Sequence, residues 1–354
     1  MDANVISTCF LPNDRTEEII PYGSGHINKT YTVKSQRGKF FLLQQINHKI
    51  FTDVESLMNN INLVTSYIKH YYPEKTTLDV IKTTTNKLYA STNDGYYRAY
   101  EFIGNSTSID IVTDANDMYI CGKGFGEFLL MLADFNAATL KETIPNFHNT
   151  ESRYKDFMLA AVEDKMGRYK TCVDEVNFVT DRKPYTSRIT SLLRSGEMPL
   201  RVTHNDTKIN NILLNKDDHS ILAVIDLDTV MPGSVCYDFG DSIRAGCNSA
   251  AEDEGDMDKV HFMLDYFKAY ARGYLEMTKD KLSQSEKDNL AFSGILMTYE
   301  CGMRFLMDYL NGDTYFHTTR PGQNLDRARN QFKLVSDMEK LLPEMEEYIR
   351  TLCK

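Results

Sequence analysis

The chain lacks several features that would place it in common classes of protein. Its seven cysteines are scattered, odd in number and never arranged as C-x-x-C, which argues against a disulfide framework or a zinc knuckle. The most apolar stretch, residues 125–140, is interrupted by Glu127 and Asp134 and is too short and too charged to cross a bilayer. The first residues, MDAN, carry no signal-peptide pattern. We therefore expect a soluble cytoplasmic protein with no membrane partner.

The charge distribution also has no basic tract. With 40 Lys and Arg against 50 Asp and Glu, the net charge is −10, so electrostatic capture of nucleic acid is not expected. The acidic excess suits either a cationic substrate or simple solubility. A length of 354 residues with 42% hydrophobic content allows two domains or one two-lobed enzyme. We expect a monomer.

The first hundred residues alternate between apolar and polar positions and contain glycine turns, a pattern typical of antiparallel strands. Residues 51–70 instead show helical spacing of their apolar side chains. We expect one helix within a small sheet whose strands cover residues 17–22, 27–34, 39–46, 78–84, 88–91 and 96–103.

A polar linker at 104–108 precedes a mostly helical sequence. Its one β segment, residues 200–228, contains a predicted hairpin of strands 212–215 and 221–226. The expected fold class is α+β, with a small antiparallel-sheet lobe at 1–103 and a large helical lobe at 104–354. Its helices are expected near residues 115–140, 151–172, 181–195, 256–277, 285–311 and 323–350.

The sequence HNDTKINN at 204–211, followed by the hairpin and Asp226, is the strongest functional signal. Phosphoryl transfer of the kinase type needs one carboxylate for the attacking hydroxyl, and an amide oxygen with a second carboxylate for Mg²⁺. Asp206 fits the first role, and Asn211 and Asp226 fit the second. Lys208 is placed to bring positive charge to the transferred phosphoryl group. Each residue alone has an ordinary structural interpretation, but the joint spacing predicts a phosphoryl-transfer site that uses ATP and Mg²⁺.

Neighbouring residues have weaker assignments. If the second hairpin strand continues, Asp228 lies on the same face as Asp226 and could hold a second ion or contact substrate. His204 is expected to brace the loop. Asp238 is expected to begin a helix and to anchor the backbone of the catalytic loop.

A glycine loop, formed by Gly23, Ser24, Gly25 and His26, lies between two predicted strands. A dinucleotide-binding fold would require a helix directly after it, and the chain has no Walker A sequence. A glycine loop between antiparallel strands can instead cover nucleotide phosphates with its backbone N–H groups.

These residues together resemble the aminoglycoside phosphotransferase and choline kinase group of small-molecule kinases, which have a protein-kinase-like two-lobed fold. A closer likeness, to the N-acetylhexosamine 1-kinase subfamily, is carried by residues 23–28, 203–211, 225–233, 237–241, 300–305 and 312–316.

The resemblance implies transfer of the ATP γ-phosphate to the anomeric hydroxyl of N-acetylglucosamine or N-acetylgalactosamine. It implies that Asp206 is the base and that Asn211 and Asp226 hold magnesium. By the same resemblance, the sugar contacts are His26, Arg304 and Tyr315, and the hinge offered to adenine is Glu101, Phe102 and Ile103.

Two departures and two rival functions accompany this resemblance. The third strand, FFLLQQ at 40–45, has glutamine where protein kinases carry a lysine, and Asn28 stands where a third glycine might be expected. One rival function is phosphorylation of a cationic acceptor such as an aminoglycoside or choline, although the absence of tryptophan disfavours an aromatic cage. The other is a catalytically silent nucleotide-binding module. Arg304 also has a structural alternative, an exposed ladder with Glu300 and Asp308.

Overall fold

The computed structural model describes residues 3–23 and 27–354. The chain forms two compact units. The smaller consists of Met1–Ser108, Ala138–Pro145 and Ile212–Met231, and the larger of Ile109–Ala137, Asn146–Asn211 and Pro232–Lys354. The smaller unit thus includes two segments from later in the sequence. The assignment of functional lobes at residues 1–103 and 104–354 stays a prediction.

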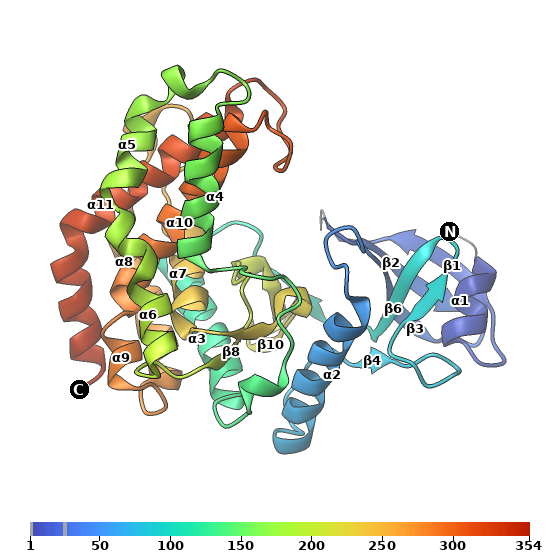
Figure 1. Cartoon of the computed structure of the whole chain (residues 1–354). Helices are drawn as coiled ribbons and strands as arrows, with labels where there is room; N and C mark the ends of the chain where they lie inside the picture. Colours follow the sequence, from blue (N-terminus) through green and yellow to red (C-terminus); the bar gives the residue numbers. More distant parts are fainter. Residues whose placement is uncertain (1–2, 24–26) are drawn as a thin grey trace. The chain divides into compact units, whose positions relative to one another are not determined.

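An antiparallel sheet forms the centre of the smaller unit, with strand order β1-β2-β3-β6-β4 and β5 paired to β6. Figure 1 shows these strands beside the short helix α1 (Ala3–Phe10). The strands are β1 (Thr16–Pro21), β2 (Lys29–Ser35), β3 (Phe40–Ile46), β4 (Val80–Ile81), β5 (Ala90–Thr92) and β6 (Gly95–Glu101).

The two faces of this sheet differ in chemistry because successive side chains of a strand point in opposite directions. One face is apolar and packs with Ile6 and Phe10 of α1 in a single buried cluster, to which β3 contributes Phe41 and Leu43. The other face carries polar side chains, including Arg98 of β6. The sheet therefore has an apolar core on one side and a buried charge, Arg98, on the other.

Helix α2 (Val54–Tyr71) begins at Asp53, whose side chain accepts a hydrogen bond from the Ser56 amide and satisfies one of the first free N–H groups. Its buried Asn60 donates to the carbonyls of Lys141 and Val230, at 2.7 and 2.9 Å. These bonds join the two later segments of the smaller unit, residues 138–145 and 212–231, to α2.

A second small sheet of this unit has the order β10-β9-β7. Strands β9 (Ile212–Asn215) and β10 (Ile221–Val224) form the predicted hairpin, and β7 (Ser106–Thr107) pairs with β9. A 3₁₀ turn, η5 (Leu227–Thr229), follows β10.

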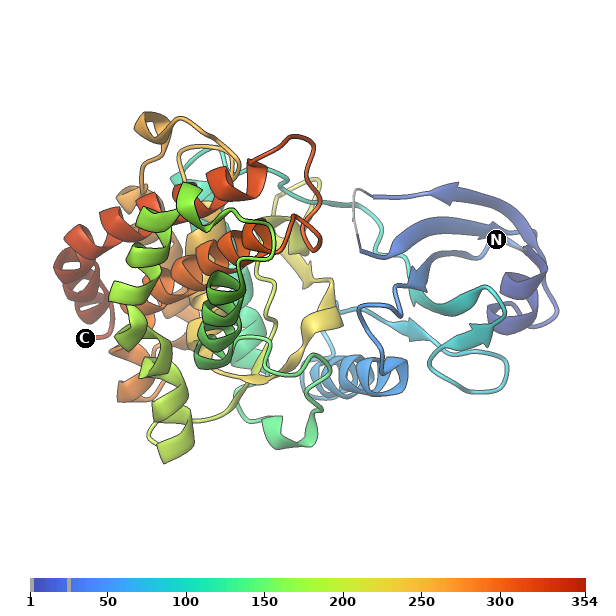
Figure 2. The same cartoon turned by 45° about the horizontal axis from the view of Figure 1, so that its top comes forward.

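The larger unit is mainly helical. Figures 1 and 2 both show its two long C-terminal helices, α10 and α11, side by side. Its α-helices are α3 (Ala115–Met131), α4 (Thr150–Glu163), α5 (Val173–Asp181), α6 (Arg188–Ser195), α7 (Val235–Gly246), α8 (Leu264–Thr278), α9 (Gln284–Lys287), α10 (Leu290–Leu310) and α11 (Gln323–Leu352). Its remaining elements are the strand β8 (Arg201–Thr203) and the 3₁₀ turns η2 (Tyr169–Thr171), η3 (Lys183–Ser187), η4 (Ile209–Asn211) and η6 (Met257–Lys259). The turn η1 (Ala137–Thr139) and the strand β11 (Met231–Gly233) contain residues of both units.

Glycines allow the helices of this unit to approach closely. A Cβ built on Gly122 of α3 would lie 2.1 Å from the carbonyl oxygen of Tyr270 in α8, and one on Gly273 of α8 would lie 2.2 Å from that of Tyr119. A Cβ on Gly240 of α7 would similarly meet the Ser293 carbonyl of α10 at 2.3 Å. The absence of side chains at these positions lets backbone pack against backbone around the segment that carries the catalytic loop.

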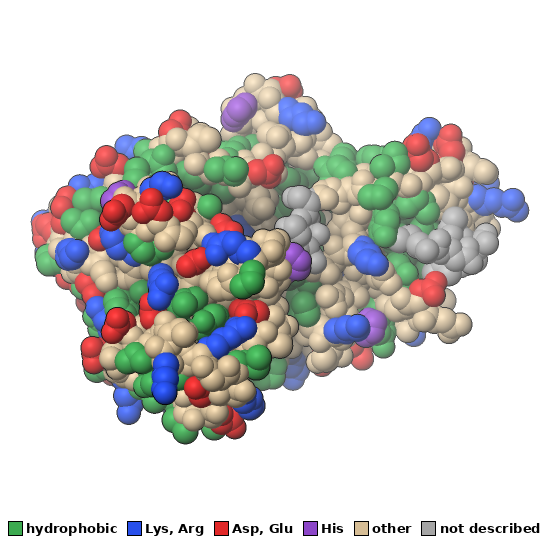
Figure 3. Space-filling model, turned by 90° about the horizontal axis from the view of Figure 1, so that it is seen from above, with side chains coloured by type: hydrophobic (Ala, Val, Ile, Leu, Met, Phe, Trp, Pro, Cys, Tyr) green, Lys and Arg blue, Asp and Glu red, His purple; other side chains and the backbone are tan. Residues whose placement is uncertain are grey.

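The α+β fold class is confirmed, with an antiparallel sheet early in the chain and a helical remainder. Helices α1, α5 and α7 lie outside the predicted helix ranges, although a helix beginning at Asp238 was expected, and the predicted helix at 256–277 begins only at Leu264. Within the described chain, no helix is long and apolar enough to cross a membrane. Acidic and basic side chains are interspersed on the face shown in Figure 3.

Candidate functional site

The predicted catalytic loop, residues 204–211, belongs to the larger unit and is held by the first turn of α7. The carboxylate of Asp238 accepts hydrogen bonds from the backbone amides of His204 (2.8 Å) and Asn205 (2.7 Å). The Thr207 hydroxyl donates to the Asp238 carbonyl at 2.7 Å, and its amide donates to the Asp241 carboxylate at 3.3 Å. The predicted role of Asp238 as a backbone anchor is confirmed.

The two anchoring aspartates have different electrostatic environments. Burial raises the pKa of Asp238 to about 6, despite the opposing effects of His204 and of the two backbone N–H groups. Burial acts in the same direction on Asp241, but Arg244, whose Nε lies 2.8 Å from it, outweighs burial and lowers its pKa. The loop is therefore held by one carboxylate that ionises reluctantly and by a second that an arginine keeps ionised.

Within the loop, Asp206 and Lys208 form an ion pair of 2.9 Å. The Asp206 amide donates to His204 Nδ1 at 3.3 Å, and the His204 ring packs edge-on against Phe125 and Phe128. The histidine therefore braces the loop, as the sequence suggests. Asp206 is partly exposed, so its carboxylate is accessible to a ligand.

Asn211 is oriented by a hydrogen bond from its Nδ2 to the Asp206 carbonyl, at 2.8 Å. That bond uses the donor end of the amide. The Oδ1 atom has no hydrogen-bond partner among the residues that the structure describes. An amide oxygen held in this way is suited to coordinate a hard cation.

Asp226 follows β10 in the smaller unit and has left-handed backbone angles, φ 60° and ψ 55°. A non-glycine residue in this region costs roughly 1–2 kcal/mol and is often found at functional sites. The strand ends at Val224, and residues 227–229 turn into η5. The condition under which Asp228 would share a face with Asp226, a strand that continues past Asp226, is therefore not met, because the chain changes direction at Asp226.

Asp228 is buried and already paired. Its Oδ1 lies 2.5 Å from a guanidinium nitrogen of Arg98 on β6, and its Oδ2 accepts a 2.6 Å hydrogen bond from Asn28 Nδ2. Sequence reasoning noted Asn28 only as a departure and missed Arg98. The available signal was a charged residue within the otherwise apolar and aromatic segment YYRAY at 96–100, since buried arginines are rare unless they are paired.

The predicted nucleotide-binding residues lie in the smaller unit, and only some are described. Gly23 has φ 77°, a left-handed conformation suited to glycine, while Ser24, Gly25 and His26 lie outside the described residues. Glu101 ends β6, and its amide donates to the Asp79 carbonyl. Phe102 packs edge-on against Tyr22 and Phe40, and the Ile103 carbonyl accepts from Ser106.

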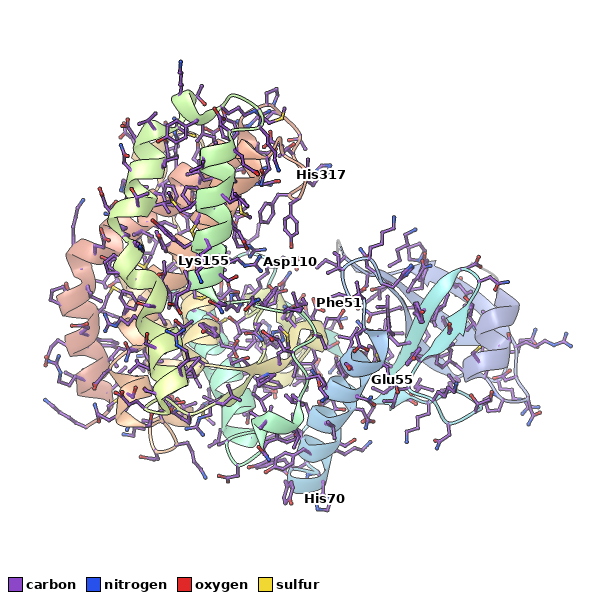
Figure 4. All side chains as sticks on the ribbon, in the orientation of Figure 1. Phe51, Glu55, His70, Asp110, Lys155 and His317 are labelled. Atoms are coloured by element: carbon purple, nitrogen blue, oxygen red, sulfur yellow. The ribbon has the colours of Figure 1, made fainter. Side chains whose placement is uncertain are left out.

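Arg304 and Tyr315 come together in the larger unit, where the Arg304 guanidinium lies 5.8 Å from the Tyr315 ring centre and 5.4 Å from that of Phe316. The predicted ladder with Glu300 and Asp308 is absent from the described chain. The cation is placed over aromatic faces instead. His317, labelled in Figure 4, belongs to the same loop between α10 and α11.

Asp308 of α10 holds the backbone of the loop between α10 and α11. Its carboxylate accepts hydrogen bonds of 2.9 Å from the backbone amides of Thr314, Tyr315 and Phe316, and a fourth from Asn324 Nδ2. Three successive N–H groups converge on one buried carboxylate, so the direction in which Tyr315 leaves the loop depends on Asp308.

Glu300, one turn before Arg304 on α10, is fully buried. It accepts hydrogen bonds from His148 Nδ1 (2.9 Å) and the Thr150 hydroxyl (2.5 Å). Burial would raise its pKa, but these partners outweigh burial and lower it. A second arginine, Arg153, has its pKa lowered by burial and by repulsion from Arg304. Sequence spacing gave no signal for His148 or Arg153, because both lie far from α10 in the sequence.

Among the described residues, no group of three or more His, Cys, Asp and Glu side chains could hold a metal ion. The metal ligands predicted from the sequence are different, since they pair one carboxylate with one amide. These ligands, Asn211 and Asp226, belong to different units, and their role stays a prediction.

Residues 18–278 match the phosphotransferase enzyme family. This chain belongs to that family. The match includes the catalytic loop and the hairpin, but it ends before Arg304 and Tyr315.

Solved structures of small-molecule kinases have the same fold as this phosphotransferase. The aminoglycoside phosphotransferase from Alicyclobacillus acidocaldarius is 11% identical, with a TM-score of 0.62 over 99% of this chain and 97% of that one. The choline kinase from Cryptosporidium parvum is 15% identical, with a TM-score of 0.56 over 94% and 92%. The amicoumacin kinase hAmiN in complex with AMP-PNP, Ca²⁺ and Ami is 12% identical, with a TM-score of 0.58 over 94% of this chain and 88% of that one.

Proposed function

We propose that this phosphotransferase uses ATP and Mg²⁺ to phosphorylate the anomeric hydroxyl of an N-acetylhexosamine, N-acetylglucosamine or N-acetylgalactosamine. The observation that carries the proposal is the geometry of the 204–211 loop. Asp238 holds the backbone immediately before Asp206, and Asn211 Nδ2 donates to the Asp206 carbonyl. The similar amicoumacin kinase binds the ATP analogue AMP-PNP, which supports ATP as the donor.

In this proposal Asp206 accepts the proton of the acceptor hydroxyl as the phosphoryl group arrives. An anomeric hydroxyl is more acidic than an ordinary alcohol, so one carboxylate suffices as the base. Lys208 balances the charge of Asp206 in the resting protein and can turn toward the γ-phosphoryl group, because its side chain is half exposed. Positioning and charge neutralisation then do most of the work.

Asn211 Oδ1 and the Asp226 carboxylate are the proposed ligands of Mg²⁺. Both are hard oxygen donors, which this ion prefers. When bound, Mg²⁺ would neutralise charge on the nucleotide phosphates. The left-handed backbone of Asp226 and the Asn211 Nδ2 hydrogen bond each fix the direction of one donor.

The nucleotide itself is proposed to bind the smaller unit. Gly23, Ser24 and Gly25 would cover the phosphates, and the backbone of residues 101–103, Glu101, Phe102 and Ile103, would meet adenine. Because the Glu101 amide and the Ile103 carbonyl already have partners, the peptide group between Phe102 and Ile103 is the proposed contact.

The acceptor is proposed to contact His26, Arg304 and Tyr315. The arginines argue against the rival cationic acceptors, since Arg304 and Arg153 would repel an amine. The rings of Tyr315 and Phe316 also already face the Arg304 guanidinium, so a quaternary ammonium would have to displace that cation. A neutral sugar, whose hydroxyls accept hydrogen bonds from arginine, has neither difficulty.

An acceptor panel tests the proposal. The protein is incubated with ATP, Mg²⁺ and, separately, N-acetylglucosamine, N-acetylgalactosamine, an aminoglycoside and choline, and the phosphorylated hydroxyl is located by NMR. We expect a sugar 1-phosphate. Turnover with amines alone would establish the cationic-acceptor alternative in its place.

The variant Asp206→Asn separates an enzyme from a silent nucleotide-binding module. We expect kcat to fall by roughly 10³-fold or more, since base catalysis and positioning are both lost, while AMP-PNP binding is retained. The matched control is Asp217→Asn, in the exposed turn between β9 and β10. Unchanged turnover in Asp206→Asn would rule out Asp206 as the base.

A further inference from the structure

Protein kinases place a lysine on the third strand of the sheet to contact nucleotide phosphates and an acidic residue of the following helix. Here β3 carries Gln44 and α2 offers no acidic partner on its inner face. Glu55, labelled near the start of α2 in Figure 4, is exposed. From α2, the Met58 sulfur lies 3.9 Å from the Arg98 guanidinium.

The missing positive charge is found one strand away. Arg98 of β6 lies directly opposite Gln44 in the β3–β6 register, and opposed residues of antiparallel strands point to the same face. The Arg98 Nε donates to Gln44 Oε1 at 2.9 Å, and Gln44 Nε2 donates to the Thr30 hydroxyl of β2 at 2.9 Å. The glutamine therefore links the arginine to the middle of the sheet.

The Arg98 guanidinium is ion-paired with the Asp228 carboxylate. Arg98 is 1% exposed and Asp228 is 4% exposed, and the two form the 2.5 Å ion pair. Burial alone would lower the pKa of Arg98, but Asp228 more than offsets burial and raises it, so the guanidinium stays charged. A buried charge requires such a partner.

The other oxygen of Asp228 is also engaged. It accepts from Asn28 Nδ2, while Asn28 Oδ1 accepts from the Asn47 amide at 3.0 Å. Strands β2, β3 and β6 thus all reach the turn η5 through one continuous network. Within the unit, Asp228 Oδ2 is hydrogen-bonded to Asn28, and the buried Oδ1 lies against the Arg98 guanidinium as an ion pair without a hydrogen bond.

We infer that Arg98, the buried cation beside Gln44, acts as a positioning residue and does not take over the phosphate contact of the β3 lysine of protein kinases. Its pairing with Asp228 fixes η5 and thereby the left-handed turn at Asp226. The inference rests on the proposed function, in that Asp226 is taken as a ligand of the nucleotide-bound Mg²⁺. Arg98 therefore affects metal–nucleotide binding without touching the phosphates, and Asp228 is not itself a metal ligand.

The test measures AMP-PNP binding by calorimetry, with Mg²⁺ and with EDTA, for Arg98→Gln, Arg98→Lys and Asp228→Asn. We expect Arg98→Gln and Asp228→Asn to weaken Mg²⁺–AMP-PNP binding by at least tenfold. Binding in EDTA should stay within twofold of the wild-type value. Arg98→Lys keeps the charge but not the Gln44 bond, and we expect partial recovery. The double variant should lose no more affinity than the worse single variant, because paired residues act as one unit.

The control for lost stability is Leu43→Ala, which opens a cavity in the same sheet on the opposite face. We expect this variant to lower the melting temperature without changing the ratio of the AMP-PNP affinity in Mg²⁺ to the AMP-PNP affinity in EDTA. A second test combines Gln44→Lys with Arg98→Gln, so that the positive charge moves from β6 to the opposed position on β3. This swap should recover binding less well than Arg98→Lys, since a lysine on β3 does not reproduce the Asp228 bond.

Three results would overturn the inference. In the first, Arg98→Gln binds Mg²⁺–AMP-PNP as the wild type does. In the second, it loses affinity equally in EDTA, which would mean direct phosphate contact. In the third, the losses from Arg98→Gln and Asp228→Asn add. A wild-type protein that binds Mg²⁺–AMP-PNP but phosphorylates no sugar would instead overturn the proposed acceptor, while the binding data would still decide the role of Arg98.

Discussion

Replacement of Asp238 by asparagine should separate the stability of the fold from the geometry of the catalytic loop. The carboxylate accepts the backbone N–H groups of both His204 and Asn205, immediately before Asp206. Asparagine has a nearly identical shape but only one acceptor atom. One of the two loop bonds is therefore lost, and the cost of burying an ionised group disappears with it.

The size of both effects follows from the structure. The pKa of Asp238 is raised from 3.8 to about 6, chiefly by burial, which corresponds to about 3 kcal/mol at 1.36 kcal/mol per unit. Because the folded-state pKa is the higher one, the contribution of Asp238 to the free energy of unfolding is greatest below pH 3.8. It falls as the pH rises through about 6. The lost hydrogen bond to a charged acceptor is worth about 1.5–3 kcal/mol.

Urea unfolding of both proteins at several pH values, together with kcat at pH 7.5, tests these values. We expect the free energy of unfolding of wild type minus that of Asp238→Asn to decrease by up to about 3 kcal/mol between pH 4 and pH 7. At pH 7.5 we expect kcat to fall by about 10- to 100-fold, since the loop is less well held. A stability difference that stays constant over this pH range would refute the argument that burial raises the pKa of this carboxyl group.

The remaining predictions concern the larger unit. Asp308→Asn should raise the KM for the acceptor by about tenfold and leave that for ATP unchanged, because the loop bearing Tyr315 loses acceptors worth about 1.5 kcal/mol or more; equal changes in both constants would contradict this. Glu300→Gln should lower the free energy of unfolding by about 1–3 kcal/mol, since the amide presents a donor to His148 or Thr150, and an unchanged melting temperature would exclude that cost. Gly122→Ala should destabilise by about 1–3 kcal/mol through overpacking with both KM values unchanged, and wild-type stability would show that α3 and α8 can separate without cost.

Local sequence patterns predicted much of the fold because the relevant interactions are local. The hairpin of β9 and β10 follows from turn residues close together in the chain, and the buried apolar face of α2 follows from the periodicity of its side chains. The short helices α1 and α5 were missed. They have few residues over which periodicity can be recognised, and packing of an apolar face stabilises such helices more than propensity does.

The candidate site divides in a similar way. The residues of the catalytic loop share one short segment, and Asp238 anchors them from a helix whose beginning is visible in the sequence. The setting of Asp228 could not be predicted from the sequence. A strand can be extrapolated from its pattern, whereas the left-handed turn at Asp226 precedes a segment whose partners lie elsewhere in the chain. The i,i+4 interpretation of Arg304 failed for a related reason, since its aromatic partners come from the loop after the helix.

By itself the sequence determined the class of reaction, because phosphoryl transfer uses a small set of oxygen ligands and a base at nearly fixed spacing. Only the tertiary structure decided how those groups are held. The Asp228–Arg98 pair joins residues far apart in the chain, and Gln44 meets Arg98 only through the register of two strands. Burial decides whether such charges are costly or stabilising, and burial is a property of the folded chain, which composition and spacing do not specify.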